Sequence, residues 1–366
     1  MIRVLHIISD LNVAGAQTVV MNYLRYSNQF PGIEMAVTVQ IHSQNTRYEQ
    51  ECKRLGIEVH YLNYRPSKAI PLLRPLINWL QLQWLHYKDI KKYSPDIVHT
   101  HVTPLLQHTL FPIVFSGVKK RFHTLHSDPY AIDTLSVLFA KMAFHIWSFY
   151  PICVTEGQAL KAEKRYRINH YSIIRNGIDL ERYSKTNKEE IRKELGIDIN
   201  TFVIGCIGRL NKIKNHSFLL KVFSEYNKLN PDSILLLVGE GEEKERIVSL
   251  GNDLDIKDRL MFTGLRDDVE RLFSAMDLFM LTSFSESSSI VTVEAQMAGI
   301  RCVVSDSIPE NVVISGLVNR IPLDAGIEKW INAIEGKIKP DATNHSPNDF
   351  SVLKAVADLR ELYNKI

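Results

Sequence analysis

Short runs of β-branched and other apolar residues alternate along this chain with longer stretches in which apolar residues recur at helical spacing. The alternation restarts near residue 200, after a polar stretch at 179–190. Such alternation favours parallel sheets covered by helices on both faces. The pattern predicts strands at 2–8, 34–39, 58–62, 96–101, 121–125, 151–155, 201–208, 233–239, 259–264, 277–283 and 301–306.

The same pattern predicts an α/β protein built from two doubly wound domains of similar size. We expect the first domain at 1–178 and the second at 190–345, because 366 residues exceed one typical core. The segment 346–366 has apolar residues at helical spacing. We expect it to form a helix that packs back on the first domain.

Composition narrows the class of protein. Charged residues make up 23% and hydrophobic residues 45%, as in ordinary soluble enzymes. The four cysteines are far apart, which argues against a disulfide framework and a zinc knuckle and favours the cytoplasm. We expect neither a signal peptide nor a membrane span, because no window holds about 18 uncharged apolar residues.

Charge is distributed unevenly between the two halves. Residues 1–183 hold 21 Lys and Arg against 13 Asp and Glu, whereas residues 184–366 hold 23 against 28. The first half therefore carries +8 and the second −5. We expect the two halves to face different partners.

The stretch 286–299, "ESSSIVTVEAQMAG", follows a predicted strand. In open α/β sheets, ligands bind where strands end. The stretch predicts a loop with Glu286, then a helix from about Ile290 with Glu294 in its first turns. Backbone N–H groups there suit an anion, and the two carboxylates suit sugar hydroxyls. A serine N-cap beside two solvated acids is the alternative, and spacing alone does not decide between them.

A second stretch, 205–216, places Arg209 and Lys214 directly after a predicted strand. An Arg fork and a Lys charge at this place suit a diphosphate, and a solvated basic loop is the alternative. Gly15, in "NVAGAQT", is a weak phosphate-loop signal. Gly239 and Gly241 are explained by a strand-to-helix turn.

Together these motifs resemble the retaining glycosyltransferases of family 4, which have the GT-B architecture of two Rossmann-like domains facing across a cleft. The resemblance covers nearly the whole chain. The stretch that begins at Glu294, "EAQMAGIRCVVSDSIPENV", is most similar to bacterial enzymes of capsule and exopolysaccharide assembly. The matching stretches are residues 14–15, 96–101, 123–128, 173–179, 208–215, 238–243, 262–277 and the pair Glu286 and Glu294.

The resemblance implies transfer of a sugar from a nucleotide-diphosphate donor, with a UDP-sugar favoured, to a glycan or lipid-linked acceptor. It implies no metal, no other cofactor and no nucleic-acid partner. The leaving phosphate oxygen would take the acceptor proton, so neither carboxylate needs to be a nucleophile.

The resemblance also implies a role for each matching residue. Arg209 and Lys214 would neutralise the diphosphate, Glu294 would bind the ribose, and Glu286 would contact the sugar. His126 would be a cleft histidine near the reacting centre. The remaining donor-binding residues would be Gly15, Gly208, Leu265, Ser287, Ser288, Ser289 and Ile290.

Three residues depart from the family pattern, namely Ala14, Gln17 and Ser287. They leave open a catalytically inactive nucleotide-sugar-binding protein, and a nucleotide-sugar epimerase of the same fold is a further alternative. Glycoside hydrolysis has no use for the Arg/Lys pair.

Two other patterns are interpreted without a metal. The "DLD" at 253–255 does not end an apolar strand and is expected to be a solvated loop. The histidines at 99, 101, 123 and 126 are expected to line a cleft, because no clear set of metal ligands accompanies them.

The stretch 72–93 is a candidate for peripheral contact with the anionic inner face of the cell membrane. The alternative is a core-packed helix with a basic end. The residues expected to touch lipid are Trp79, Trp84, Lys88, Lys91, Lys92, Lys119, Lys120 and Arg121. A second apolar stretch, 135–150, is expected to be a buried helix.

Overall fold

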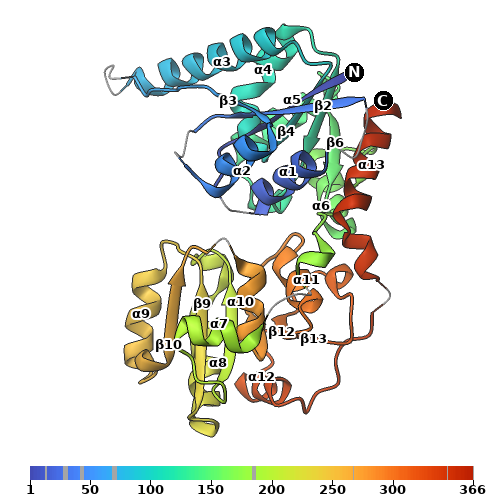
Figure 1. Cartoon of the computed structure of the whole chain (residues 1–366). Coiled ribbons are helices and arrows are strands. Elements are labelled where there is room, and N and C mark those ends of the chain that lie inside the picture. The colour runs from blue at the N-terminus through green and yellow to red at the C-terminus, as the bar shows by residue number, and fades with distance from the viewer. Residues whose placement is uncertain are drawn as a thin grey trace. The chain divides into compact units, whose positions relative to one another are not determined.

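The computed structural model describes residues 1–12, 15–27, 32–41, 45–67, 72–183, 187–266, 268–343 and 345–365. The chain divides into two compact units (Figure 1). The first comprises residues 1–177 with 352–366, and the second comprises residues 178–351. Ala14 and residues 184–186 of the polar stretch lie outside the described residues.

The first unit is built on a seven-stranded parallel sheet with the order β3-β2-β1-β4-β5-β6-β7. The order reverses between β1 and β4, which is where ligand sites form in such sheets. The strands are β1 (Ile2–Ile8), β2 (Ile33–Val39), β3 (Glu58–Tyr61), β4 (Ile97–His101), β5 (Lys120–Thr124), β6 (Tyr150–Cys153) and β7 (Ser172–Ile173). The α-helices are α1 (Gly15–Tyr26), α2 (Arg47–Leu55), α3 (Arg74–Tyr93), α4 (Leu106–Ser116), α5 (Thr134–His145), α6 (Glu156–Tyr166) and α13 (Val352–Lys365).

The second unit has a six-stranded parallel sheet with the order β10-β9-β8-β11-β12-β13. Its strands are β8 (Phe202–Ile207), β9 (Ser233–Val238), β10 (Leu260–Gly264), β11 (Leu278–Leu281), β12 (Arg301–Ser305) and β13 (Val318–Ile321). Its α-helices are α7 (Lys188–Leu195), α8 (His216–Leu229), α9 (Lys244–Asp253), α10 (Val269–Ala275), α11 (Ile290–Met297) and α12 (Ile327–Ile334). The predicted two-domain α/β fold is confirmed.

Two edge strands were not predicted from the sequence. Strand β7 has only two residues, which is too short for any periodicity, and β13 reads "VNRI" with two polar residues in the middle. Pairing to a neighbouring strand defines both, since β7 lies beside β6 and β13 lies beside β12.

The last helix, α13, belongs to the first unit and covers part of its sheet. Tyr363 is fully buried, and its ring lies 5.0 Å from that of Phe122 on β5. Lys120 Nζ donates to the backbone oxygen of Tyr363 at 3.0 Å. Gly177 allows the helix to approach, because a Cβ there would lie 2.5 Å from Cα of Val352.

No α-helix among the described residues is long and apolar enough to cross a membrane. Helix α5 differs from its expected burial, since the side chains of Leu135 and Leu138 are both about half exposed. The four cysteines are buried free thiols.

Candidate active site

The centre of the candidate site in the second unit is an ion pair between Lys214 and Glu286. These residues follow β8 and β11, which are neighbouring strands, so their loops meet at one edge of the sheet. Lys214 Nζ donates to Oε1 of Glu286 at 2.6 Å, and the hydroxyl of Ser283 donates to the same oxygen at 2.7 Å. The two ion-paired side chains are only 17% and 13% exposed.

Two polar residues hold the backbone that carries Lys214. The side-chain oxygen of Asn211 accepts from the Lys214 N–H at 3.1 Å, and residues 212–214 form a short 3₁₀ helix. The hydroxyl of Thr282 donates to the backbone oxygens of Lys214 and Asn215. Asn211 could have been found from the sequence, because Asn is a frequent cap. Thr282 could not, because its contact depends on the β8–β11 pairing.

Close contact between two loops explains the glycines after β8 and β9. A Cβ on Gly239 would lie 2.0 Å from the backbone oxygen of Gly208, and one on Gly241 would lie 2.2 Å from that of Leu210. The two loops are also joined by a bond from the Leu210 N–H to the Glu240 oxygen at 2.9 Å. Gly239 and Gly241 were expected only to form a strand-to-helix turn. The structure shows that they are also needed for the close approach of the two loops.

Arg209 lies on the same loop but does not touch Lys214 or Glu286 in the hydrogen bonds and ion pairs of the described residues. Its side chain is 71% exposed and pairs with Glu242 at 3.1 Å. An exposed pair of this kind is weak and easily exchanged. A diphosphate arriving at this edge could therefore take Arg209 from Glu242.

Helix α11 begins at Ile290, as predicted. The N-cap alternative is wrong for Ser289, because its hydroxyl is bonded to the Thr292 hydroxyl at 2.8 Å instead of a backbone N–H. Ser289 also adopts a left-handed backbone with φ of 36°. The start of α11 can therefore offer backbone N–H groups to an anion.

Glu294 lies within α11 and has a partner that sequence reasoning missed. The hydroxyl of Tyr183 donates to Oε1 of Glu294 at 2.5 Å. Burial raises the pKa of Glu294, although the Tyr183 hydroxyl and the Arg182 charge act in the opposite direction. Tyr183 lies in the polar stretch at 179–190, between the two predicted domains. No local pattern there indicates a contact with a residue 111 positions away.

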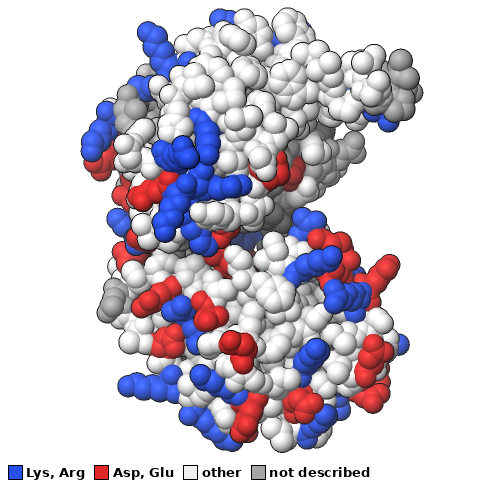
Figure 2. Space-filling model, turned by 180° about the vertical axis from the view of Figure 1, so that it is seen from behind, with Lys and Arg blue, Asp and Glu red and all other residues white. Residues whose placement is uncertain are grey.

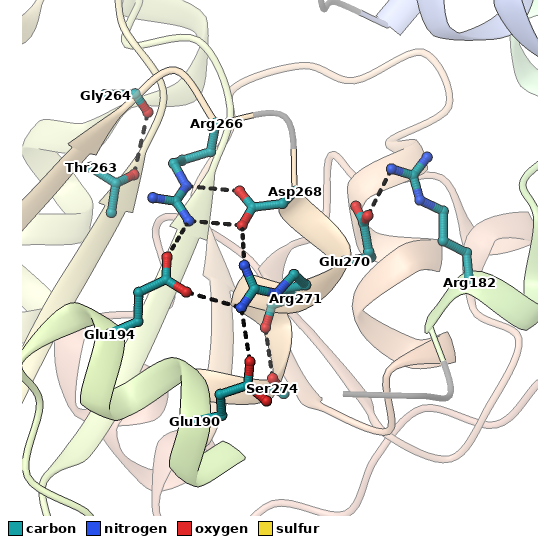
Figure 3. Close-up of polar contacts among 10 residues, drawn as sticks. All are labelled: Arg182, Glu190, Glu194, Thr263, Gly264, Arg266, Asp268, Glu270, Arg271 and Ser274. Carbon is teal, nitrogen blue, oxygen red and sulfur yellow. Dashed lines mark hydrogen bonds and ion pairs between the residues drawn. The ribbon is translucent and has the colours of Figure 1, made fainter. Parts of the chain in front are cut away.

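Leu265 follows β10 and is 74% exposed. An ion-pair network holds the loop that carries it (Figure 3). Arg266 pairs with Asp268 through two bonds at 2.8 and 2.7 Å, and with Glu194 of α7 at 2.9 Å. Arg271 of α10 bonds to the same two carboxylates. The hydrogen bonds from Arg266 to Asp268 and Glu194 raise the pKa of Arg266, because these carboxylates stabilise its charged form. Ion pairs therefore fix this loop.

The first unit contains a cluster of fully buried histidines near its strand-order reversal. His6 and His99 are paired in register across β1 and β4, and His101 lies two residues further along the same face. The row of histidines ends at His126, which follows β5 and is half-buried. His6 was not among the predicted residues, because a histidine in the apolar run 2–8 gives no signal of its neighbours.

Ring nitrogens connect three of these histidines in series. His6 Nδ1 lies 3.0 Å from His101 Nε2, and His101 Nδ1 lies 3.1 Å from His126 Nε2. Burial lowers the pKa of His6 to about 3 and that of His126 to about 4. These rings are therefore neutral near pH 7. His123 points to the other face of the sheet, where it bonds to Thr100 at 2.8 Å.

His6, His99 and His101 could each offer a nitrogen to a metal, since these nitrogens lie within 4.8 Å of one another. Hydrogen bonds occupy both nitrogens of His101 and Nδ1 of His6, whereas Nε2 of His6 has no partner among the described residues. Both nitrogens of His99 already have partners, Tyr363 at 2.6 Å and Thr124 at 2.7 Å. The "DLD" residues Asp253 and Asp255 are exposed at the end of α9, which agrees with the solvated interpretation.

Gly15 is the first residue of α1, and a Cβ there would meet no atom of the described residues within 4 Å. Packing in the first unit therefore does not explain this glycine. The amide of Gln17 donates to Asp10 at 3.2 Å and to Ser9 at 3.4 Å. Gln17 thus holds the end of β1 in place.

Family models match both halves of the chain. Residues 13–182 match the model described as Glycosyltransferase Family 4, and residues 187–343 match Glycosyl transferases group 1. With the two doubly wound units and the Lys214–Glu286 pair at a strand edge, the chain belongs to the GT-B glycosyltransferases.

The relatives agree with this assignment. The Escherichia coli UDP-Gal:alpha-D-GlcNAc-diphosphoundecaprenol alpha-1,3-galactosyltransferase is 28% identical, over 85% of this chain and 87% of its own. The putative glycosyltransferase EpsF of Bacillus subtilis (strain 168) is 26% identical, over 91% and 86%. The structure of Anabaena Alr3699/HepE in complex with UDP-glucose has a TM-score of 0.79 at 18% identity, over 100% of both chains. It has the same fold.

Proposed function

We propose that this protein transfers a sugar, with retention of configuration, from a UDP-sugar to a glycan or lipid-linked acceptor. The observation that carries the proposal is the largely buried Lys214–Glu286 pair, together with the exposed Arg209 on the same loop as Lys214. Two cations suit a diphosphate, and a carboxylate suits sugar hydroxyls. The galactosyltransferase and the UDP-glucose complex named above support a UDP-sugar donor.

The mechanism follows from the charge that develops on the leaving group. As the bond from the anomeric carbon to the diphosphate oxygen breaks, negative charge grows on that oxygen. Arg209, Lys214 and the N–H groups at the start of α11 would stabilise it, as donors of the oxyanion-hole type do. The acceptor oxygen bonds to the anomeric carbon on the same face. Its proton passes to the leaving phosphate oxygen.

Glu286 would take a different role once the donor is bound. In the described contacts its Oε1 accepts from both Lys214 and Ser283. When Lys214 turns to the phosphate, this carboxylate becomes available to the hydroxyls of the sugar. Glu294 would hold the ribose hydroxyls through the oxygen that Tyr183 does not occupy.

We propose that transfer needs no metal ion, because Arg209 and Lys214 supply the positive charge. Transfer activity should then survive EDTA. Activity that is abolished by chelation and restored by Mn²⁺ or Mg²⁺ would contradict this part of the proposal.

The acceptor would bind the first unit, at the carboxyl ends of β2 and β3. A pocket of about 430 Å³ lies there, lined by Gln40, Ile41, Asn63, Tyr64, Arg65 and Pro66. Oε1 of Gln40 is buried without a hydrogen-bond partner among the described residues. An amide, an aromatic ring and an arginine together suit a glycan that carries a phosphate.

The first unit would also contact an anionic membrane. Leu76, Leu80 and Trp84 are each more than half exposed and lie four residues apart on α3, so they share one face. The top of the first unit, where Figure 1 places α3 and α4, carries few charged side chains in Figure 2. Four lysines that belong to α3 or follow α4 in the sequence are exposed, namely Lys88, Lys91, Lys92 and Lys119.

Two features limit the residues that can take part in membrane contact. Trp79 packs on Phe111 and donates to Gln107, so it is a packing residue. Lys120 and Arg121 bond to backbone oxygens within the first unit. We therefore assign lipid contact to Trp84 and the exposed lysines.

We propose that the protein acts in bacterial surface polysaccharide synthesis, on the cytoplasmic side of the membrane. The names of the relatives support this role, because one of them acts on a sugar linked to diphosphoundecaprenol. An epimerase of the same fold would instead convert the donor without an acceptor.

Thermal shift against UDP-, GDP- and ADP-sugars tests the donor first. A ligand at 100 times its dissociation constant adds about 2.7 kcal/mol of stability. We expect the UDP-sugars to give the largest shift, followed by transfer to a lipid-diphosphate-linked sugar. Conversion of the donor without acceptor would support the epimerase, and the absence of any shift would contradict the donor assignment.

A further inference from the structure

The three connected histidines have a direction that their hydrogen bonds determine. Each neutral imidazole carries one N–H donor and one acceptor nitrogen. In the series from His6 through His101 to His126, a donor on one ring must face an acceptor on the next. Only two arrangements satisfy both contacts, one with all donors pointing toward His126 and one with all donors pointing toward His6.

The buried end of the series distinguishes the two arrangements. Nε2 of His6 is buried without a hydrogen-bond partner among the described residues. If the donors pointed toward His6, this nitrogen would carry an unpaired N–H in the core. Among backbone groups, orphaned buried N–H donors are rarer than under-satisfied acceptors, and we expect the same order for an imidazole. The unpaired atom is therefore better explained as a bare acceptor, with the proton of His6 on Nδ1.

The assignment at His6 then passes along the series. The Nδ1–H of His6 donates to Nε2 of His101, and the Nδ1–H of His101 donates to Nε2 of His126. Because Nε2 of His126 accepts, its own proton is on Nδ1. No described residue is hydrogen bonded to that Nδ1. His126 thus presents an N–H donor at the end of β5.

We propose that His6 and His101 are positioning residues that hold His126 in its neutral Nδ1–H form, so that a hydrogen-bond donor is presented at the end of β5. The role of this donor in catalysis rests on the proposed glycosyltransferase function. The tautomer itself does not, because it follows from the contacts within the first unit.

The tautomer can be observed directly by long-range ¹H–¹⁵N correlation spectra of protein labelled with ¹⁵N-histidine. The signals of His126 are assigned from their loss in His126→Asn. We expect wild-type His126 to carry its proton on Nδ1. In His101→Leu the donor to Nε2 is lost, and we expect the Nε2–H form of His126 to become populated.

Two further variants separate tautomer control from general disruption. His101→Asn keeps an N–H near the position of Nδ1 and should retain the wild-type tautomer at His126. His123→Asn alters a buried histidine on the opposite face and should leave it unchanged. If His101→Leu does not fold, His6→Phe interrupts the series one ring earlier and should give a mixture of both forms at His126.

Kinetics test the catalytic half of the proposal. Loss of one hydrogen bond of about 1.4 kcal/mol corresponds to about a tenfold fall in rate. We expect His101→Leu to lower kcat by about three- to tenfold while the affinity for free UDP stays unchanged, and His101→Asn to restore most of kcat. An unchanged kcat in His101→Leu would overturn the catalytic half.

An Nε2–H tautomer at His126 in the wild type, or an Nδ1–H tautomer that persists in His101→Leu, would overturn the assignment of positioning residues. Neither result depends on whether the protein transfers a sugar. Failure of the proposed function would instead appear as an absence of UDP-sugar binding with the tautomers as expected.

Discussion

Arg209 and Lys214, two basic residues after β8, have different surroundings, although both follow the same strand in the sequence. Lys214 is largely buried and paired, whereas Arg209 extends into solvent. Under the proposed function, both stabilise charge that grows on the leaving diphosphate.

We expect Arg209→Ala and Lys214→Ala each to lower turnover by about 10²–10³, as the loss of one preorganised donor does. Steady-state transfer assays measure the effect. Lys228→Ala, which removes an exposed lysine on α8, is the matched control and should be silent. Near-wild-type turnover in both folded variants would exclude the diphosphate role.

Tyr183 gives a second prediction at this scale. Its hydroxyl holds one oxygen of Glu294, so Tyr183→Phe should allow that carboxylate to turn away from the position proposed for the ribose. A lost hydrogen bond of about 0.5–1.5 kcal/mol predicts a two- to tenfold weaker affinity for UDP, with little change in kcat. Isothermal titration calorimetry measures the affinity.

Tyr226→Phe on α8 removes a comparable hydroxyl elsewhere in the second unit and should leave the affinity for UDP unchanged. Glu294→Ala should weaken UDP binding at least as much as Tyr183→Phe. The positioning role fails if Tyr183→Phe binds UDP as the wild type does while Glu294→Ala does not.

Among the elements, α7 is anchored to the second sheet by a buried arginine. Arg192 is 1% exposed and donates to the carboxylate of Asp277 at 2.6 Å and to several backbone oxygens. Removing one partner of a buried pair costs about 3–5 kcal/mol, so Arg192→Leu should lower the free energy of unfolding by that amount. Denaturant titration measures it.

Lys188 is the control for Arg192, because it pairs with the same Asp277 from a side chain that is 45% exposed. Surface pairs contribute about 0–1 kcal/mol, so Lys188→Ala should have a small effect. Equal losses in the two variants would show that burial does not decide the contribution of this pair.

The contact between β3 and α3 should depend on pH. His60 Nδ1 lies 2.8 Å from Asp89 and Nε2 lies 3.0 Å from Glu58. Burial alone would lower the pKa of His60, but the two carboxylates outweigh it and raise the pKa. The stabilisation is therefore complete below the ordinary pKa of about 6.5 and is lost as pH rises through the raised value.

Melting temperatures of the wild type and His60→Gln across this range test the contact. The difference between the two proteins should be largest at low pH and should shrink as His60 loses its proton. A difference that is constant with pH would show that the charge of His60 does not contribute.

The elements themselves were largely predictable from the sequence, and the contacts between distant residues were not. An apolar run placed β1 over its full length, because buried parallel strands leave such a run, and the serine loop placed the start of α11 at Ile290. The partners of Glu294 and His126 left no such sign. Tyr183 reaches Glu294 from a 3₁₀ helix 111 residues away, and His101 reaches His126 through the pairing of β4 with β5, and a local pattern encodes neither contact.

For the whole molecule, the proposed membrane contact predicts a dependence on lipid charge and salt. Each lysine near an anionic surface contributes about 1 kcal/mol, screened within about 8–10 Å at ordinary salt. In liposome sedimentation, binding should need anionic lipid and fall between low and physiological salt. It should weaken when Lys88, Lys91 and Lys92 are neutralised, or when Trp84 is replaced by glutamate.

Neutralising Lys228, Lys244 and Lys337 in the second unit removes the same number of charges and should leave sedimentation unchanged. Equal, negligible pelleting with neutral and anionic vesicles at low salt would end the membrane proposal. It would leave the family assignment untouched.

The position of α13 in the chain determines the order in which the two units can complete their folding during translation. The ribosome completes residues 1–177 first, yet the helix that covers His99 and Phe122 is translated only after the whole second unit. At about 5–20 residues per second, this delay is roughly ten to thirty seconds. During that time the nascent first unit exposes an apolar face of its sheet, and the emerging second unit is complete before the first is closed.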